Sequence, residues 1–261
     1  MIHAGRERPA FTIDAFHRGD FWLVQPRDAG HRAGMDALML AAAVPSCFRG
    51  HLADFGAGAG AAGLAVAARC PDATVTLVEQ SAEMAGYARQ TLAHEGNARL
   101  APRLSLLEAD VTMTGKARAE AGLADNAFDF VIMNPPFNMA RDRATPDELR
   151  RRAHVMEDGL FESWLRSAAA VVRPRGGLAL IARPQSLPQI LAALAGRFGS
   201  AGIMPIHPRT DADAIRIVLR ATKGARGALS LCPPLVLHEH GHKLSARADA
   251  VSNGRASLFG D

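Results

Sequence analysis

The sequence has 261 residues, of which 48% are hydrophobic and 21% charged, a balance typical of a globular protein with a substantial core. It holds no apolar run long enough for a transmembrane helix, and the polar, basic start MIHAGRERPAF lacks the apolar stretch of a signal peptide. Cys47, Cys70 and Cys232 are too scattered for a disulfide or zinc framework. We therefore expect a cytoplasmic protein without membrane contact, whose formal charge of +4 is compatible with a nucleic-acid partner.

Short apolar runs alternate with helical segments along most of the chain. Strands are expected at 52–56, 74–79, 103–109, 128–133, 178–182, 202–206 and 214–220. Helices are expected at 61–70, 81–95, 158–172 and 187–197, the second with Ser81 as its N-cap. This alternation predicts a mostly parallel sheet with helices on both faces. Only the short polar loop HPRTDAD joins the last two strands, so that pair is expected to be antiparallel.

A glycine-rich turn, Asp54-Phe55-Gly56-Ala57-Gly58-Ala59-Gly60, follows the first of these strands and opens a helix. Glycines permit a tight turn and let a ligand lie directly against the backbone. Together with Gly63 the stretch also spells GxGxxG, and Glu79 ends the next strand. The pattern predicts a nucleotide-type cofactor. It does not separate NAD from S-adenosylmethionine (SAM), because both carry a ribose whose hydroxyls suit a carboxylate acceptor.

Two acidic residues favour SAM. The turn begins with Asp54, as in the methyltransferase form DxGxGxG, whereas a dehydrogenase needs no acid there. Asp110 follows the third strand, where its carboxylate can accept a hydrogen bond from an adenine amino group, although a loop or helix-capping aspartate is the alternative. With the asparagine described next, the candidate cofactor residues are Asp54, Gly56, Gly58, Gly60, Glu79, Asp110 and Asn134.

The fourth strand runs directly into Asn134-Pro135-Pro136-Phe137. The two prolines fix the backbone, so that the Asn134 side-chain oxygen and the Pro135 carbonyl can point the same way. Two acceptors that hold both hydrogens of an NH₂ group free its lone pair for attack on a methyl group. Asn134 is neutral, so its role is alignment rather than proton removal. Phe137 can stack on a flat substrate, and Asn134, Pro135 and Phe137 are the candidate catalytic residues.

The tetrad and the turn resemble the class I SAM-dependent amino-methyltransferases that modify adenine N6, guanine N2 or glutamine amides. Across nearly the whole chain the pattern is similar to the bacterial family of tRNA (valine) adenine-N6 methyltransferases. Residues 25–38 resemble that family's entry segment, although an aromatic residue is more usual at His31. The resemblance implies that Arg32 to Asp36 close over the methionine end of SAM, with Asp36 starting a helix.

The fold class implied is α/β: a Rossmann-like class I methyltransferase with a seven-stranded, mostly parallel sheet and a terminal antiparallel hairpin. Residues 1–20 are expected to be a flexible tail and residues 21–261 a single methyltransferase domain. The expected function is SAM-dependent methylation of an exocyclic amino group, most readily adenine N6 in tRNA. Guanine-N2 methylation of ribosomal RNA, glutamine-N5 methylation of a protein, and a non-catalytic SAM- or NAD-binding module remain alternatives.

Several basic residues are weaker candidates for RNA contact. They are Arg32, Arg150, Arg151, Arg152, His207 and Arg209. The arginine run follows the tetrad and lies beside the expected active site, but a solvated helix face is an equally good interpretation. His238, His240 and His242 alternate in LHEHGH, yet they lack an acidic or cysteine partner on the same face. A solvated surface strand is therefore favoured there, and no metal is expected.

Overall fold

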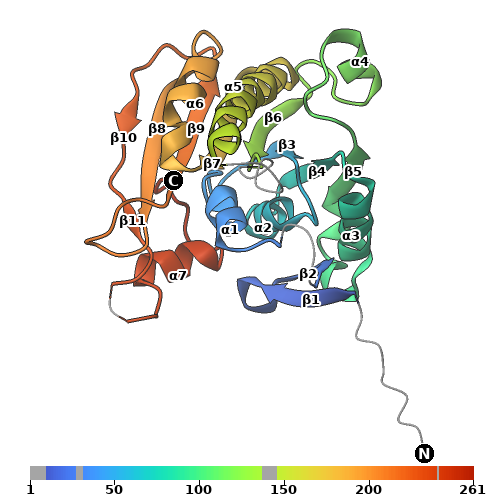
Figure 1. The fold of residues 1–261 in the computed structure, drawn as a ribbon. Coiled ribbons are helices and arrows are strands. Elements are labelled where there is room, and N and C mark those ends of the chain that lie inside the picture. Colours follow the sequence, from blue (N-terminus) through green and yellow to red (C-terminus); the bar gives the residue numbers. More distant parts are fainter. Residues whose placement is uncertain (1–9, 28–31, 137–145, 240) are drawn as a thin grey trace, which may run out of the picture.

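The computed structural model describes residues 10–27, 32–136, 146–239 and 241–261, and the side chains of 146–158 are not described (Figure 1). Within these ranges the core is a nine-stranded sheet. Its seven long strands are β3 (Gly50–Phe55), β4 (Ala73–Glu79), β5 (Leu104–Glu108), β6 (Phe128–Met133), β7 (Val172–Ala182), β8 (Phe198–His207) and β9 (Arg216–Lys223). Two short strands, β10 (Ser230–Leu231) and β11 (Leu235–Val236), pair with β8.

The strand order is β10-β8-β9-β7-β6-β3-β4-β5, and β9 is antiparallel to both of its neighbours, β7 and β8. The pairs β3–β4, β3–β6, β4–β5 and β6–β7 are parallel. This confirms the predicted α/β class, the parallel sheet and the terminal antiparallel hairpin. The two short strands add to the seven that were expected.

Seven α-helices are present in the described residues. They are α1 (Met35–Ala42), α2 (Ala61–Arg69), α3 (Ala82–Ala93), α4 (Gly115–Glu120), α5 (Pro146–Val171), α6 (Leu187–Leu194) and α7 (Ala246–Ser252). The hydroxyl of Ser81 accepts a hydrogen bond from the Met84 N–H, so the predicted N-cap of α3 is confirmed. Among the described residues, no helix has the length and apolarity that crossing a membrane would need.

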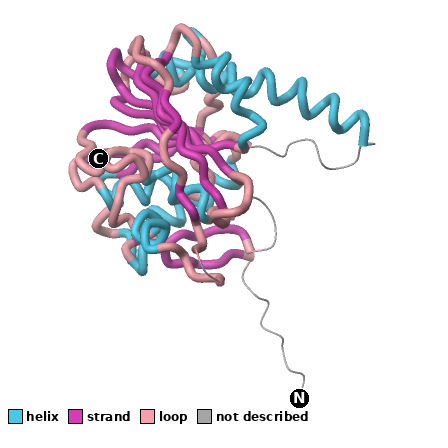
Figure 2. The backbone as a smooth tube through the Cα atoms, turned by 90° about the vertical axis from the view of Figure 1, so that its left-hand side faces the viewer, coloured by secondary structure: helices cyan, strands magenta, loops and turns pink. Residues whose placement is uncertain are grey.

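Two apolar cores lie on opposite faces of the sheet. Residues of α1, α2, α3 and α7 form one core, and residues of α5 and α6 form the other. Consecutive residues of β3 show the division, because Leu52 belongs to the first core and Ala53 to the second. Figure 2 shows α5 extending from the sheet well beyond the rest of the molecule. The sheet is therefore covered on both faces, as parallel sheets require.

An N-terminal hairpin is formed by β1 (Phe11–Phe16) and β2 (Phe21–Pro26). The prediction of a flexible tail over residues 1–20 is therefore wrong for 11–20. Figure 1 shows the hairpin beneath the lower end of α3, and its register pairs Phe11 with Pro26. Phe21 and Leu23 of β2 are fully buried in the first core, which supplies the free energy that a two-stranded hairpin lacks by itself. The expected single domain from residue 21 stays a prediction.

A buried amide joins this hairpin to the loop after α3. Asn97 is fully buried, and its Oδ1 accepts from the Trp22 N–H (2.8 Å). Its Nδ2 donates to the carbonyls of Trp22 and Thr91, both at 2.7 Å. The Thr91 hydroxyl accepts from the Val24 N–H at 3.0 Å. These bonds satisfy the edge of β2 that faces away from β1.

We predict that Asn97→Ala lowers the free energy of unfolding by about 2–4 kcal/mol, because it leaves the N–H and carbonyl of Trp22 without their Asn97 partner and removes one of the two hydrogen bonds to the Thr91 carbonyl. Chemical denaturation measures the loss. Gln90→Ala, which removes an exposed amide from α3, is the matched control and should change stability by less than about 0.5 kcal/mol. Equal stabilities of the two variants would show that the amide does not hold the hairpin.

Candidate active site

A cavity of about 540 Å³ lies at the carboxyl edge of the parallel strands. It is lined by the ends of β3 and β4, by the segments that follow β3 and β6, and by residues of α1, α2, α5 and β9. Its size falls in the range of about 300–1,000 Å³ that small-molecule and cofactor sites occupy. In doubly wound sheets, ligands bind at this edge.

The glycine-rich turn after β3 lines one side of the cavity. Gly56, Gly58 and Gly60 have φ values of 68°, 58° and 98°, a left-handed conformation that favours glycine. A Cβ atom at Gly56 would lie 2.6 Å from the Trp164 ring, so the close packing of α5 also requires glycine there. The backbone of Gly56 and Ala57 donates to the Val78 carbonyl at 2.8 and 3.1 Å. The turn is thus held against β4.

The carboxylates of Asp54 and Glu79 hold this turn in place by hydrogen bonds to backbone N–H groups. The Asp54 carboxylate is buried and accepts from the Gly63 N–H at 2.8 Å. The pKa of Asp54 is raised to about 7, mainly by burial and also by the nearby Glu79 carboxylate, while the Gly63 hydrogen bond lowers it. The two oxygens of Glu79 accept from the Gly58 and Ser81 N–H groups, both at 2.8 Å. Both acids also line the cavity, as the sequence predicted for cofactor residues.

Asn134, Pro135 and Pro136 line the same cavity, directly after β6. Because β6 lies next to β3 in the sheet, the tetrad and the glycine-rich turn are neighbours. The structure therefore brings the predicted amide acceptor and the predicted cofactor turn into one site. Phe137, the stacking candidate, lies outside the described residues.

Other predicted residues lie elsewhere. The described residues that line the cavity include Ala109 and Val111 but not Asp110, whose Oδ1 accepts from the N–H and the hydroxyl of Thr112, both at 2.7 Å. His207 Nδ1 is 2.6 Å from the Ala212 carbonyl and closes the β8–β9 loop, in which Arg209 is exposed. The side chains of Arg150, Arg151 and Arg152 lie outside the description.

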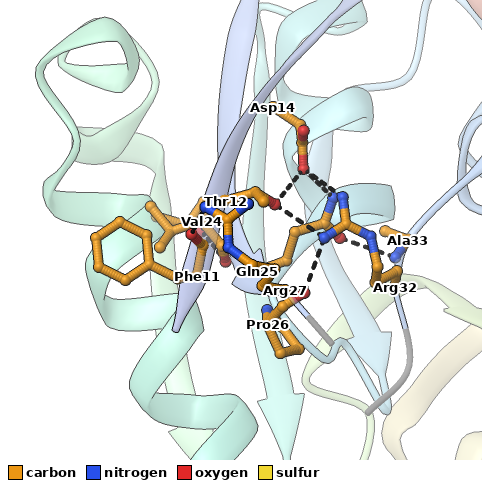
Figure 3. Close-up of polar contacts among 10 residues, drawn as sticks. Phe11, Thr12, Asp14, Val24, Gln25, Pro26, Arg27, Arg32 and Ala33 are labelled. Atoms are coloured by element: carbon orange, nitrogen blue, oxygen red, sulfur yellow. Dashed lines mark hydrogen bonds and ion pairs between the residues drawn. The ribbon is translucent and has the colours of Figure 1, made fainter. Parts of the chain in front are cut away.

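Arg32 is engaged by the N-terminal hairpin rather than by the cavity lining (Figure 3). Its guanidinium donates to the Thr12 hydroxyl, the Pro26 carbonyl and the Asp14 carboxylate at 2.8–2.9 Å. Partial burial tends to raise the pKa of Asp14, but hydrogen bonds from Gln25 and Thr12 and the Arg32 charge lower it overall. Arg32 thus ties the hairpin to the segment that leads into α1.

The histidine run does not form the surface strand that was expected. β11 ends at Val236, and His238 lies in the irregular segment after it, where its Nδ1 is 3.0 Å from the Lys243 carbonyl. Imidazoles two residues apart lie on one face only in a β-strand, and the described residues after Val236 do not continue the strand. His240 lies outside the described residues. In the described ranges, no three histidine, cysteine or acidic side chains gather in a metal-binding group.

Two contributions to the cavity were missed by the sequence analysis. Trp164 of α5 lines it, although the spacing of Phe161, Trp164, Leu165 and Ala168 reads as an ordinary buried helix face. Arg216 at the start of β9 also lines it, and its Nε donates to Asp36 Oδ2 of α1 at 2.8 Å. The pairing of residues 180 positions apart leaves no local signal in the sequence.

Comparisons with known proteins agree with this geometry. Residues 32–203 match the family model of the methyltransferase small domain. The chain belongs to the methyltransferase small domain family. A solved structure from Agrobacterium tumefaciens, described as a predicted O-methyltransferase, is 46% identical, with a TM-score of 0.75 over 85% of this chain and 98% of that one. The protein is thus a class I methyltransferase, and its methyl donor is SAM.

Curated relatives differ in what they modify. A ribosomal RNA small subunit methyltransferase C from Pseudomonas fluorescens is 34% identical over 52% of this chain and 39% of its own length. A release factor glutamine methyltransferase from Deinococcus radiodurans is 32% identical over 54% of this chain and 48% of its own length. A tRNA1(Val) (adenine(37)-N6)-methyltransferase from Porphyromonas gingivalis is 29% identical over 58% of both chains. The chain thus spans about 40–60% of the length of these relatives.

The residues of the cavity fit SAM. A glycine turn with exposed backbone, a carboxylate at the end of β4 and apolar walls from Val78, Met84 and Val111 suit a nucleoside. SAM supplies a methyl group on a positively charged sulfur, which is already activated for transfer. The chain therefore has to bind and orient the reactants, and no protein nucleophile is needed.

We predict that Asp54 makes the stability of the protein pH-dependent. Its pKa is raised to about 7 in the folded state, so it keeps its proton there, while in the unfolded chain it ionises near 4. Wild type should therefore lose stability relative to Asp54→Asn as the pH rises from 5 to 8, by up to about 3 kcal/mol, and should change no further above that. Denaturant unfolding of both proteins at several pH values measures this. A difference that stays constant with pH would contradict it.

Proposed function

We propose that the protein transfers the methyl group of SAM to the exocyclic amino group of a base in RNA, with adenine N6 of a tRNA as the favoured acceptor. The observation that carries this proposal is the position of Asn134-Pro135-Pro136 on the cavity that also holds the cofactor turn. An amide oxygen and a proline carbonyl together offer two neutral acceptors. That arrangement suits an NH₂ group, whose two hydrogens it can hold.

Methyl transfer from SAM to an amino group requires alignment of the two reactants and no general base from the protein. In an amino group conjugated with a base, the lone pair is delocalised into the ring. Acceptors on both hydrogens favour a pyramidal nitrogen, whose lone pair then attacks the methyl carbon as the carbon–sulfur bond breaks. S-adenosylhomocysteine is the leaving group, and the methylated nitrogen then loses its extra proton to water. Asn134 does not take this proton, because an amide is not a base at neutral pH. Asn134 contributes alignment and electrostatic stabilisation of the developing positive charge.

The size of the shared region supports the choice of adenine N6 in tRNA. Similarity to the tRNA1(Val) enzymes of two Shewanella strains covers 68% of both chains at 28% identity. For the ribosomal RNA relative the match covers 39% of its own length, and for the two release-factor relatives 48% and 54%. Their similarity nevertheless keeps guanine N2 and glutamine N5 as the alternatives that an experiment must separate.

Nucleoside mass spectrometry of RNA from a deletion strain tests the acceptor. We expect N6-methyladenosine to disappear from the tRNA fraction and to return when the gene is supplied again. Loss of N2-methylguanosine from ribosomal RNA would instead assign the protein to the guanine alternative, and loss of methylglutamine from release factors, measured by peptide mass spectrometry of the same strain, would assign it to the glutamine alternative. Purified protein and unmodified tRNA should reproduce the reaction with labelled SAM.

We predict that Asn134→Ala leaves SAM affinity near that of wild type but lowers the single-turnover methylation rate by about 10²-fold or more. The lost acceptor acts on the amino nitrogen in the transition state, so the loss falls on the chemical step. Asn134→Asp keeps an acceptor oxygen in place and should retain more activity than the alanine variant. Rates within a few-fold of wild type for Asn134→Ala would refute this role of the asparagine.

A further inference from the structure

We infer that the protein has a second binding site, a cavity at the amino edge of the sheet that holds a phosphate group. This cavity measures about 480 Å³ and is lined by the starts of β6 and β7, the end of β9, part of β8, the segment before β3 and Asp261. The active-site cavity lies at the opposite, carboxyl edge, and the six-residue strand β3 separates the two by about 20 Å. The inference is independent of which acceptor is methylated.

Arginine side chains dominate the charge of this amino-edge cavity. Four arginines and two aspartates line it: Arg49, Arg173, Arg175, Arg220, Asp129 and Asp261. The cationic side chains of the lining outnumber the anionic ones, so the cavity attracts an anion.

Ion pairs use only part of this cationic surface. Arg220 is neutralised by Asp261, to which its Nη1 and Nη2 donate at 2.9 and 2.7 Å. Arg173 uses one nitrogen, Nη1, for Asp129 Oδ1 at 2.7 Å. Arg175 is exposed, and in the ranges that the structure describes it makes no side-chain hydrogen bond or ion pair. Its whole guanidinium and the other nitrogens of Arg173 therefore remain available to a ligand.

The backbone of Arg175 has a conformation that arginine disfavours. Its φ of 69° lies in the left-handed region, where a Cβ atom crowds the following carbonyl oxygen and glycine is preferred. Ser200, with a φ of 52°, is a second non-glycine residue in this region, and it lines the same cavity. Unfavourable backbone conformations collect at sites where the side chain has a role in binding. The chain thus keeps an unpaired arginine at a position that suits glycine.

The donors in the cavity suit a phosphate better than a carboxylate. A guanidinium can donate two parallel hydrogen bonds to two phosphate oxygens. Ser200 and Thr222 also line the cavity, and their hydroxyls have no hydrogen-bond partner among the described residues. A phosphate has more oxygens than a carboxylate and can therefore use more of these donors.

The volume of the cavity indicates a ligand larger than phosphate alone. It falls within the range of about 300–1,000 Å³ that small-molecule sites occupy. The ring of Phe48, which packs on Phe130 with the ring centroids 5.6 Å apart, adds an apolar side to the lining. The phosphate therefore belongs to a larger molecule, either the RNA backbone or a free phosphate compound.

Calorimetry with inorganic pyrophosphate tests the site, with S-adenosylhomocysteine at saturation so that the active-site cavity is filled. We expect saturable binding to wild type, and binding weakened by about 10-fold or more in Arg175→Gly, because charge-assisted hydrogen bonds are lost. Glycine suits a φ of 69°, so this variant should unfold at a temperature no lower than that of wild type. Ser200→Gly removes one hydroxyl at a left-handed position and should give a smaller loss of affinity.

Arg166→Ala is the matched control, because this arginine of α5 is exposed and does not line the cavity. It should leave the affinity for pyrophosphate unchanged. Equal affinities of wild type and Arg175→Gly for pyrophosphate, or no saturable binding to wild type, would overturn the inference.

Titration of unmodified tRNA at several salt concentrations identifies the source of the phosphate. If Arg175→Gly weakens tRNA binding and lowers the salt slope by about one unit, the site holds a phosphate of the RNA. If tRNA binding equals that of wild type while pyrophosphate binding is weaker, the site takes a free phosphate compound. The pyrophosphate result does not depend on methylation, so failure of the proposed function would be seen separately, in the nucleosides of the deletion strain.

Discussion

The active-site cavity depends on the attachment of the glycine-rich turn to the strand ends beside it. The turn is a run of left-handed glycines that offers its backbone to a ligand, and such a segment has no side chains with which to fix itself. Two carboxylates supply that fixation. Asp54 accepts from Gly63 inside α2, and Glu79 accepts from Gly58 within the turn. The Val78 carbonyl holds the start of the turn. The cofactor site is thus formed by hydrogen bonds already in place in the protein alone.

This arrangement has a consequence for how Asp54 acts. Burial raises its pKa to about 7, so the carboxyl is shared between its neutral and its charged form near neutral pH. A charged Asp54 makes a stronger hydrogen bond to Gly63, while a neutral one costs less to bury. A positively charged ligand in the cavity favours the charged form through simple attraction. The protonation state of Asp54 therefore sets the strength of the hydrogen bond that holds Gly63 at the start of α2.

The sequence predicted the features that local pattern encodes. The seven long strands, the N-cap Ser81 and the juxtaposition of Asp54, Glu79 and Asn134 follow from strand periodicity, capping chemistry and the rule that parallel strands place their carboxyl ends together. The N-terminal hairpin was missed because Asn97 and the first core stabilise it, and both are distant in sequence. Arg32 was predicted to contact the substrate because the hairpin that contains its partner, Asp14, was not predicted.

Arg216 shows why topology, rather than spacing, completes the site. In a fully parallel sheet the first residue of a strand lies at the amino edge, far from the cofactor. Because β9 runs antiparallel to β7, its first residue lies at the carboxyl edge instead. Asp36 stands in the first turn of α1, a helix that packs on α2 beside the glycine-rich turn, so the two charges meet over the cavity. The antiparallel strand β9 thus brings a cation from the C-terminal part of the chain to the lining of a cavity that the N-terminal half largely forms.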